Sequence, residues 1–335
     1  MPHKTKINWC DYASNPIKAR VKATGRGGHY CEPVSAGCAN CYASRMQSPY
    51  LSQLPFSKAN RDKVELFLDE KELHRLVRSK TISGKRVFVE DMSDLFGEWV
   101  CDDWLDRLFG YLFSRPDVTF CLLTKRPENI GPYFERLNRR RRGYWHEHAG
   151  YLADVAELSK AQWRAALRHY HPEPATSETP LGDTSLTIWP LPNVWLGASV
   201  ENQAAADTRI PILFQIPATL RFLSVEPMLS ELSIRKYLRA QYGEPGYCFD
   251  INNEWCYGPG SCPNCARGID WVIVGGESGP GCRPCNPDWI RSVVAQCRAA
   301  GVPVWVKQDS GPKPGMQGTI PDDLWNTKEL PYAIS

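Results

Sequence analysis

Apolar residues fall in short, nearly continuous runs that recur along the chain, and each run ends in polar residues or glycine. Six of these runs have the length of a β-strand and cover residues 86–90, 118–124, 193–197, 220–225, 270–275 and 302–307. Uninterrupted apolar strands are typical of a parallel sheet that is buried on both faces. The pattern therefore predicts a parallel sheet.

Between the runs, apolar residues return at helical spacing. One predicted helix is capped by Asp102 or Asp103, and a second begins at Asn286 and ends at Gly301. Their apolar positions are Leu105, Leu108, Phe109 and Leu112 in the first helix, and Ile290, Val293, Val294 and Cys297 in the second. This alternation predicts an α/β fold, namely a full or partial (β/α) barrel, with an open doubly wound sheet as the alternative.

Two segments interrupt the alternation of strands and helices. Residues 133–190 contain the basic run Arg139–Arg142, Trp145, four histidines and a tail rich in Pro, Ser and Thr. Residues 232–268 are rich in Cys, Gly, Tyr and Asn. We interpret both as insertions in a single domain that spans residues 1–335, serving substrate or partner binding.

Composition bounds the class of protein. The chain has 335 residues, of which 42% are hydrophobic, so it can bury a large core. No stretch approaches the roughly 20 apolar residues of a membrane span, and the N-terminus lacks the apolar core of a secretory signal. We therefore expect a cytoplasmic protein without membrane contact. The net charge of +3 is too small to indicate a polyanionic partner by itself.

Cysteine supplies the sharpest chemical signal. The chain has 13 cysteines, an odd number that argues for metal ligation over a full set of disulfides. Cys31, Cys38 and Cys41 form a C-x6-C-x2-C cluster in a glycine-containing loop. Three thiolates can hold a [4Fe-4S] cluster and leave one iron open. Structural zinc, with His29 or Cys10 as a fourth ligand, is the alternative.

Several further motifs accompany this loop. They are Met92–Phe96, Leu123–Pro127, Trp195–Asn202, Phe222–Pro227, Trp271–Ser278 and Val306–Gln308. Together with Asn15–Pro16 and the cysteine loop, they resemble a three-cysteine-motif family of phage and bacterial proteins that is grouped with the radical S-adenosylmethionine (radical SAM) enzymes. The longer C-x6-C spacing is shared with that family, whereas most radical SAM enzymes have C-x3-C-x2-C.

The resemblance implies a barrel of radical SAM type, a [4Fe-4S] cluster on Cys31, Cys38 and Cys41, and S-adenosylmethionine on the open iron. One electron from the cluster would cleave this cofactor to a 5′-deoxyadenosyl radical, which abstracts a hydrogen atom from the substrate. A flavodoxin or ferredoxin would be the reductant.

Polar residues follow the predicted strands, where a barrel places its active site. We expect them to contact S-adenosylmethionine, since carboxylates suit its ammonium and hydroxyl groups and lysine or arginine suits its carboxylate. The predicted cofactor-binding residues are Glu90, Ser93, Thr124, Lys125, Arg126, Ser199, Glu201, Asn202, Glu226, Gly275, Gly276, Glu277, Ser278 and Lys307.

A second cysteine group lies later in the chain and comprises Cys248, Cys256, Cys262, Cys265, Cys282 and Cys285. Cys262-x2-Cys265 and Cys282-x2-Cys285 have the spacing of a zinc ribbon. The four cysteines between 248 and 265 are a rival zinc set, and an auxiliary iron–sulfur cluster or unligated thiols are the other interpretations.

Basic residues next to aromatic ones indicate either contact with nucleic acid or, more commonly, a solvated helix face. Arg139–Arg142 precede Tyr144 and Trp145, and Lys18, Arg20, Lys22 and Arg26 precede the cysteine loop. The resemblance adds a substrate hypothesis, the modification or isomerisation of a nucleic-acid base or nucleotide, such as thymidine in phage DNA hypermodification. The alternatives are a radical enzyme acting on a peptide or small molecule, and a non-enzymatic zinc protein that binds nucleic acid.

Overall fold

A computed structural model describes residues 2–47, 51–140, 165–166, 190–238, 248–249, 255–256 and 268–331. Its largest sheet consists of β1 (His3–Lys4), β2 (Tyr12–Ser14), β6 (Arg86–Val89), β7 (Thr119–Thr124), β8 (Val194–Ser199), β9 (Leu220–Val225), β12 (Trp271–Val274) and β13 (Val304–Val306), paired in that order. Only the short β1 is antiparallel to its neighbour. The six predicted strands are therefore confirmed as a mostly parallel sheet in a mixed α/β fold.

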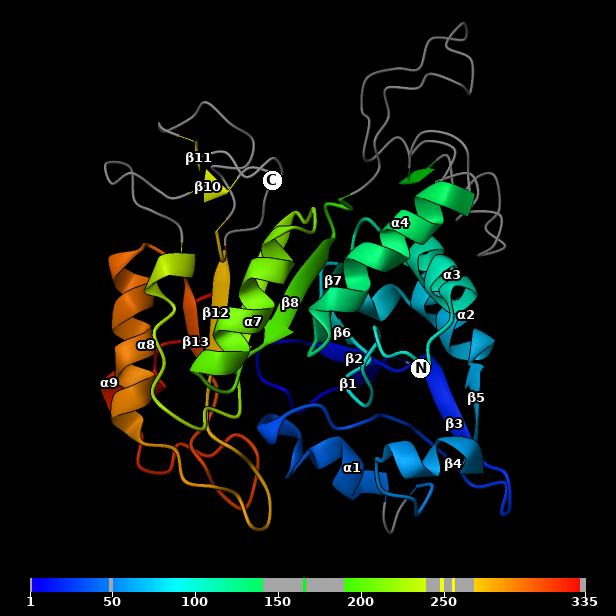
Figure 1. Ribbon diagram of the computed structural model, residues 1–335, viewed down its shortest axis with the longest axis horizontal. Coiled ribbons are helices and arrows are strands. Elements are labelled where there is room, and N and C mark those ends of the chain that lie inside the picture. Colours follow the sequence, from blue (N-terminus) through cyan, green and yellow to red (C-terminus); the bar gives the residue numbers. More distant parts are fainter. Residues whose placement is uncertain are drawn as a thin grey trace, which may run out of the picture.

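Helices alternate with the strands (Figure 1). The α-helices are α1 (Tyr42–Gln47), α2 (Glu70–Arg78), α3 (Asp102–Phe113), α4 (Ile130–Arg140), α7 (Gln203–Phe214), α8 (Pro287–Ala299) and α9 (Asp322–Trp325). Short 3-10 turns are η1 (Ala36–Cys38), η2 (Lys58–Lys63), η3 (Lys80–Ile82), η4 (Pro127–Asn129) and η5 (Arg235–Tyr237). The strands follow one another in chain order without the reversal that marks a doubly wound sheet.

The two predicted helix starts differ in outcome. Asn286 caps α8, because its side chain accepts a hydrogen bond from the backbone of Asp288, as predicted. The N-cap of α3 is Cys101, so the predicted cap at Asp102 or Asp103 is wrong; both aspartates lie in the first turn. There their charges still favour the helix, because the first turn carries the positive end of the helix dipole. Residues 133–140 of the first predicted insertion belong to α4.

Both faces of the large sheet are buried. Val87, Leu122, Leu196, Val225 and Val272 point to the helices and join the main core. Alternate residues of the same strands form a second cluster on the opposite face: Phe88, Cys121, Trp195, Phe222, Trp271 and Ile273, with Trp9 and Cys10 from the N-terminal segment. Burial on both sides explains why the strands read as continuous apolar runs.

Trp9 shows that the sheet is curved. Its ring centroid lies 4.9 Å from that of Phe88 on β6 and 5.9 Å from that of Trp271 on β12. Three strands separate β6 from β12, a distance of about 19 Å across a flat sheet at the usual strand spacing. One indole can contact both only if the sheet bends around it, with this cluster on the concave face.

Two smaller sheets complete the described strands. β3 (Ile17–Val21) pairs with β4 (Gly27–Gly28) and β5 (Val64–Leu68), and its buried residues Ala19 and Val21 pack with Tyr30 and Trp99. β10 (Cys248–Phe249) pairs with β11 (Trp255–Cys256). The first of these sheets supports the loop that carries Cys31, Cys38 and Cys41.

Candidate functional site

The three-cysteine loop, residues 31–41, lies at the carboxyl ends of the parallel strands, where α1 crosses below them in Figure 1. Cys31 follows Tyr30 of the Trp99 cluster, Cys38 ends η1, and Cys41 precedes α1. Tyr30 accepts a hydrogen bond at its carbonyl from Ser93 Oγ, over 2.6 Å. The loop that follows β6 therefore positions the first cysteine.

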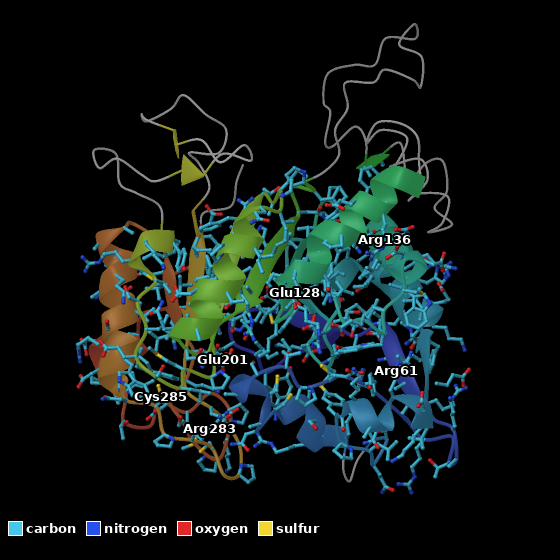
Figure 2. All side chains as sticks on the ribbon, in the orientation of Figure 1. Arg61, Glu128, Arg136, Glu201, Arg283 and Cys285 are labelled. Carbon is cyan, nitrogen blue, oxygen red and sulfur yellow. The ribbon has the colours of Figure 1, made fainter. Side chains whose placement is uncertain are left out.

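Side chains from β7 and β8 contact the same loop. Arg126 Nη2 donates to the carbonyl of Glu32 over 2.8 Å. Glu201 accepts from the backbone of Gly37 over 3.4 Å. An added Cβ on Gly37 would lie 3.2 Å from Glu201 Cδ, so this glycine lets the Glu201 carboxylate approach closely. Figure 2 shows Glu201 at this end of the molecule.

The turn after β12 holds the other half of the loop. Glu277 accepts a hydrogen bond from Asn40 Nδ2 over 2.8 Å, and Arg283 both pairs with Glu277 and donates to the carbonyl of Ala36 over 3.0 Å. Arg45 of α1 donates to the carbonyl of Ser278. Burial raises the pKa of Glu277, but hydrogen bonds from Arg283 and Asn40 outweigh it and lower the pKa to about 2.

A second polar group lies between β8, β9 and β13. Lys307 Nζ contacts both carboxylate oxygens of Glu226, at 2.7 and 2.8 Å, and Gln308 donates to the same carboxylate over 3.0 Å. Ser199 Oγ donates to the carbonyl of Glu226 over 3.2 Å. Ser199 also pairs in register with Ser224, directly above the apolar layer of Phe222. Glu226 and Lys307 thus offer opposite charges beside two serines.

Other predicted cofactor-binding residues have internal partners. Asn202 caps α7 by accepting from Ala205, and Thr124 donates to Asp94 over 2.6 Å. Arg209 holds Glu201 in a buried ion pair at 2.8 Å. Burial raises the pKa of Glu201, but the charge of Arg209 contributes to lowering it below its usual value.

Glu90 is also turned inward. It is 1% exposed and adopts a left-handed backbone conformation with φ of 62°, which is strained for a residue with a side chain. Oε1 accepts from the backbone of Ile17 over 2.6 Å, whereas Oε2 has no hydrogen-bond partner within the described residues. Burial raises the pKa of Glu90 well above its ordinary range, which favours the neutral acid.

Gly275 and Gly276 let two backbone segments approach each other. A Cβ on Gly276 would lie 2.3 Å from the backbone nitrogen of Ser310, and one on Gly275 would lie 3.0 Å from the carbonyl oxygen of Gln308. Gly276 donates its backbone hydrogen bond to that same carbonyl over 2.8 Å. The glycine turn therefore abuts the segment after β13.

The chemistry of the three thiols fits an iron–sulfur cluster. Cys31 and Cys41 pack against the same apolar cluster of Ala43, Phe56 and Met92, and Cys38 lies between them in the loop, so one loop supplies three thiol donors. In the described part of the chain, no group of three His, Cys, Asp or Glu side chains is arranged to hold a metal ion. A four-iron cluster binds each thiolate at a different iron, so its ligands need not converge on one point.

The second cysteine group is described in part. Cys285 is buried in the main core, where burial raises the pKa of its thiol to about 12, and Cys282 is half-buried. The register of β10 and β11 places Cys248 opposite Cys256. Cys262 and Cys265 lie outside the described residues, as do Arg141 and Arg142 of the basic run and the four histidines of the first insertion.

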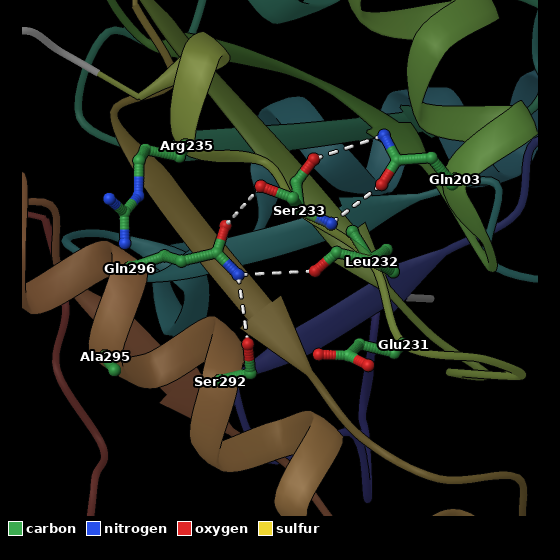
Figure 3. A pocket seen from close by; sticks show the side chains of 8 residues that line it. All are labelled: Gln203, Glu231, Leu232, Ser233, Arg235, Ser292, Ala295 and Gln296. Carbon is green, nitrogen blue, oxygen red and sulfur yellow. Dashed lines mark hydrogen bonds between the residues drawn. The ribbon is translucent and has the colours of Figure 1, made fainter.

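A separate pocket of about 620 Å³ lies between α7 and α8 (Figure 3). Gln203, Ser233 and Gln296 line it and bond to one another or to nearby backbone. None of the predicted cofactor-binding residues lines this pocket.

Several residues of the strand-end site lack an obvious sequence signal. Asn40 and Arg283 anchor the cysteine loop, and Arg45 joins α1 to the segment after β12, yet none of the three falls in a segment of regular apolar spacing. Asp94 organises β7 by accepting from Thr124 Oγ1 and from the backbone of Lys125. Its position within the Met92–Phe96 motif is the one signal that marks it.

Fold and site together define a class: a mixed α/β protein with a curved, mostly parallel sheet and a three-cysteine loop across its strand ends. The chain belongs to the family described as a protein of unknown function (DUF5131), which matches residues 4–317. Comparisons with curated proteins and with solved structures give no match. Among the helices of the described residues, none is both long and apolar enough to span a membrane.

Proposed function

We propose that the protein is a radical SAM enzyme whose active site lies at the carboxyl ends of β6, β7, β8, β9, β12 and β13. One observation carries the proposal: side chains that follow β6, β7, β8 and β12 converge on the loop of Cys31, Cys38 and Cys41. A loop held by four strand ends is positioned to present a reactive group to a ligand on the concave face. The proposal includes closure of the curved sheet into a full or partial (β/α) barrel.

Cys31, Cys38 and Cys41 would hold a [4Fe-4S] cluster. When bound, such a cluster supplies one electron that splits S-adenosylmethionine into methionine and a 5′-deoxyadenosyl radical, which takes a hydrogen atom from the substrate. A flavodoxin- or ferredoxin-type protein would supply the electron. The chain contributes position and exclusion of water.

The residues of the concave face suit the two ends of the cofactor's amino acid. Glu226 can accept from its ammonium group, and Lys307 can pair with its carboxylate. Both side chains are mostly buried, with exposures of 13% for Glu226 and 16% for Lys307. On cofactor binding, each would replace its partner in the ion pair with a charged group of the cofactor, in a site with little water. Ser199 and Ser224 offer hydroxyls in the same layer.

The substrate that we propose is a nucleic-acid base or nucleotide, which the enzyme modifies or isomerises. Its support is a group of exposed basic residues that precede the cysteine loop in the sequence: Arg20 on β3, and Lys22 and Arg26 in the turn between β3 and β4. Lys18 is engaged with Glu72 at 3.0 Å and is not part of this exposed group. Cofactor cleavage should rise when oligonucleotides or free nucleotides are added; the absence of stimulation by either would reject this substrate class.

The cluster is tested by anaerobic purification and reconstitution with iron and sulfide. We expect a brown protein that releases 5′-deoxyadenosine from S-adenosylmethionine and dithionite. Cys38→Ala should lose this activity, because the cluster would keep only two of its three thiolate ligands. Cys101→Ala is the matched control, since Cys101 is an exposed free thiol at the start of α3, and it should retain full activity.

A colourless protein that contains zinc without iron would reject the radical mechanism. It would favour the second candidate, a zinc protein that binds nucleic acid without catalysis. The register pairing of Cys248 with Cys256 is the observation that supports a zinc site in the second cysteine group.

A further inference from the structure

Arg126 follows β7 and is enclosed by protein. It is 2% exposed, its guanidinium lies 3.3 Å from Asp94 and 3.5 Å from Glu98, and it stacks 4.7 Å from the centroid of the Trp99 ring. A guanidinium with these partners is already engaged, so it is poorly placed to receive the carboxylate of a cofactor.

The same guanidinium lies beside the first cysteine of the loop. Arg126 Nη2 is 2.8 Å from the carbonyl oxygen of Glu32, and the sulfur of Cys31 is 3.8 Å from that same oxygen. The Arg126 guanidinium and the Cys31 sulfur therefore contact the same carbonyl oxygen. Burial and then Asp94 raise the pKa of the Cys31 thiol, whereas Arg126 lowers it by favouring the negatively charged thiolate.

We propose that Arg126 raises the reduction potential of the cluster bound through Cys31, as a positioning residue that acts on the electrostatics of this ligand. This inference rests on the proposed function. Reduction adds one electron from an external donor and no proton, so the site becomes more negative by one charge. A buried positive charge stabilises the reduced form, because the net charge around a cluster sets its potential and burial limits screening.

The test is a potentiometric titration of the reconstituted protein, followed by the electron paramagnetic resonance signal of the reduced cluster. Arg126→Met, which removes the charge, should shift the midpoint to a more negative potential. Arg126→Lys keeps the positive charge, so its midpoint potential should stay near the wild-type value. Arg115→Met is the matched control, because Arg115 is also buried, at 8% exposure, but bonds to Asp117 and to carbonyls at the end of α2.

The outcomes separate this inference from the proposed function. A wild-type protein that binds no four-iron cluster overturns both. A wild-type protein that binds the cluster and cleaves the cofactor, together with an Arg126→Met variant of unchanged potential, overturns this inference alone.

A surface variant keeps the test decisive if Arg126→Met loses the cluster. Glu98 is 67% exposed and lies against the Arg126 guanidinium, so Glu98→Gln removes a negative charge without emptying a buried site. It should shift the potential to a less negative value at low ionic strength, where screening is weakest. An unchanged potential in this variant would also overturn the inference.

Discussion

Glu277 joins three parts of the molecule through one carboxylate. It accepts from Asn40 within the cysteine loop and from the backbone and guanidinium of Arg283, which in turn reaches Ala36. The side chain is 5% exposed. Hydrogen bonds to a charged group contribute more than neutral ones, and leaving a donor unpaired in a buried site costs further free energy.

Glu277→Gln should lower the free energy of unfolding by about 1.5–3 kcal/mol at pH 7, the range for hydrogen bonds to a charged group. The pKa of Glu277 is lowered from 4.5 to about 2, so its contribution is present above pH 4.5 and is lost as the pH falls towards 2. Urea unfolding at a series of pH values should show that the difference in free energy of unfolding between wild type and variant becomes smaller as the pH falls over that range. Glu231→Gln, on an exposed carboxylate, is the control and should show no such difference.

The polar residues of the strand ends could be predicted from the sequence, but most of their partners could not. A residue that follows a parallel strand lies at the carboxyl edge of the sheet, so the sequence pattern alone places Glu226, Lys307 and Lys125 at that edge. Whether such a residue faces a ligand or another side chain depends on the surrounding loops. Their sequences have no regular apolar spacing from which their course could be predicted. Arg283 and Asn40, which engage Glu277, come from loops of this kind.

At the scale of elements, β8 and β9 illustrate how closely the strands fit. A Cβ on Gly197 of β8 would lie 2.5 Å from the Phe222 ring of β9, which is fully buried between Trp9 and Trp271. The ring therefore lies across the strand where a side chain would otherwise project. Dense packing leaves it no room to move away.

Gly197→Ala should destabilise the protein by about 1–3 kcal/mol, the usual cost of overpacking a core. Adding Phe222→Leu should recover part of that loss, since a smaller side chain makes space for the methyl group; purely additive losses in the double variant would contradict the contact. Gly131→Ala on α4 is the control. Nothing lies within 4 Å of its added Cβ, so helix propensity should stabilise this variant by about 0.5–1 kcal/mol. Thermal and urea unfolding measure both changes.

Long apolar strands were predictable as elements because burial on both faces leaves a continuous apolar run. Most of the short strands were not: β2, for example, has three residues, too few to show a period. β3 is different, because Ile17–Val21 alternates buried with more exposed residues, which is the pattern of a half-buried strand. Short strands are stabilised by pairing with residues far along the chain, as β3 pairs with β5. The local sequence pattern does not identify the partner strand.

At the scale of the whole molecule, the N-terminal segment packs on the concave face of the sheet, whose strand ends hold the cysteine loop. Trp9 is 1% exposed and contacts aromatic rings of β6, β9 and β12, whose centroids lie 4.9, 6.0 and 5.9 Å away. A single side chain thus joins strands that are not neighbours in the sheet. We expect the curvature, and with it the convergence of the strand ends, to depend on this indole.

Trp9→Ala should lower the free energy of unfolding by about 3–5 kcal/mol, the range for removing a large buried aromatic side chain. Trp289→Ala on α8 is the matched control, because Trp289 is only partly buried against the core and its loss should cost less. Because Trp9 joins strands whose carboxyl ends hold the cysteine loop, its removal should also loosen that loop. Proteolysis of the folded protein should therefore cut the 31–41 loop faster in Trp9→Ala than in Trp289→Ala. Equal cleavage rates, measured at urea concentrations that give the two variants the same free energy of unfolding, would show that the loop is held by its own strand-end contacts, independently of the curvature of the sheet.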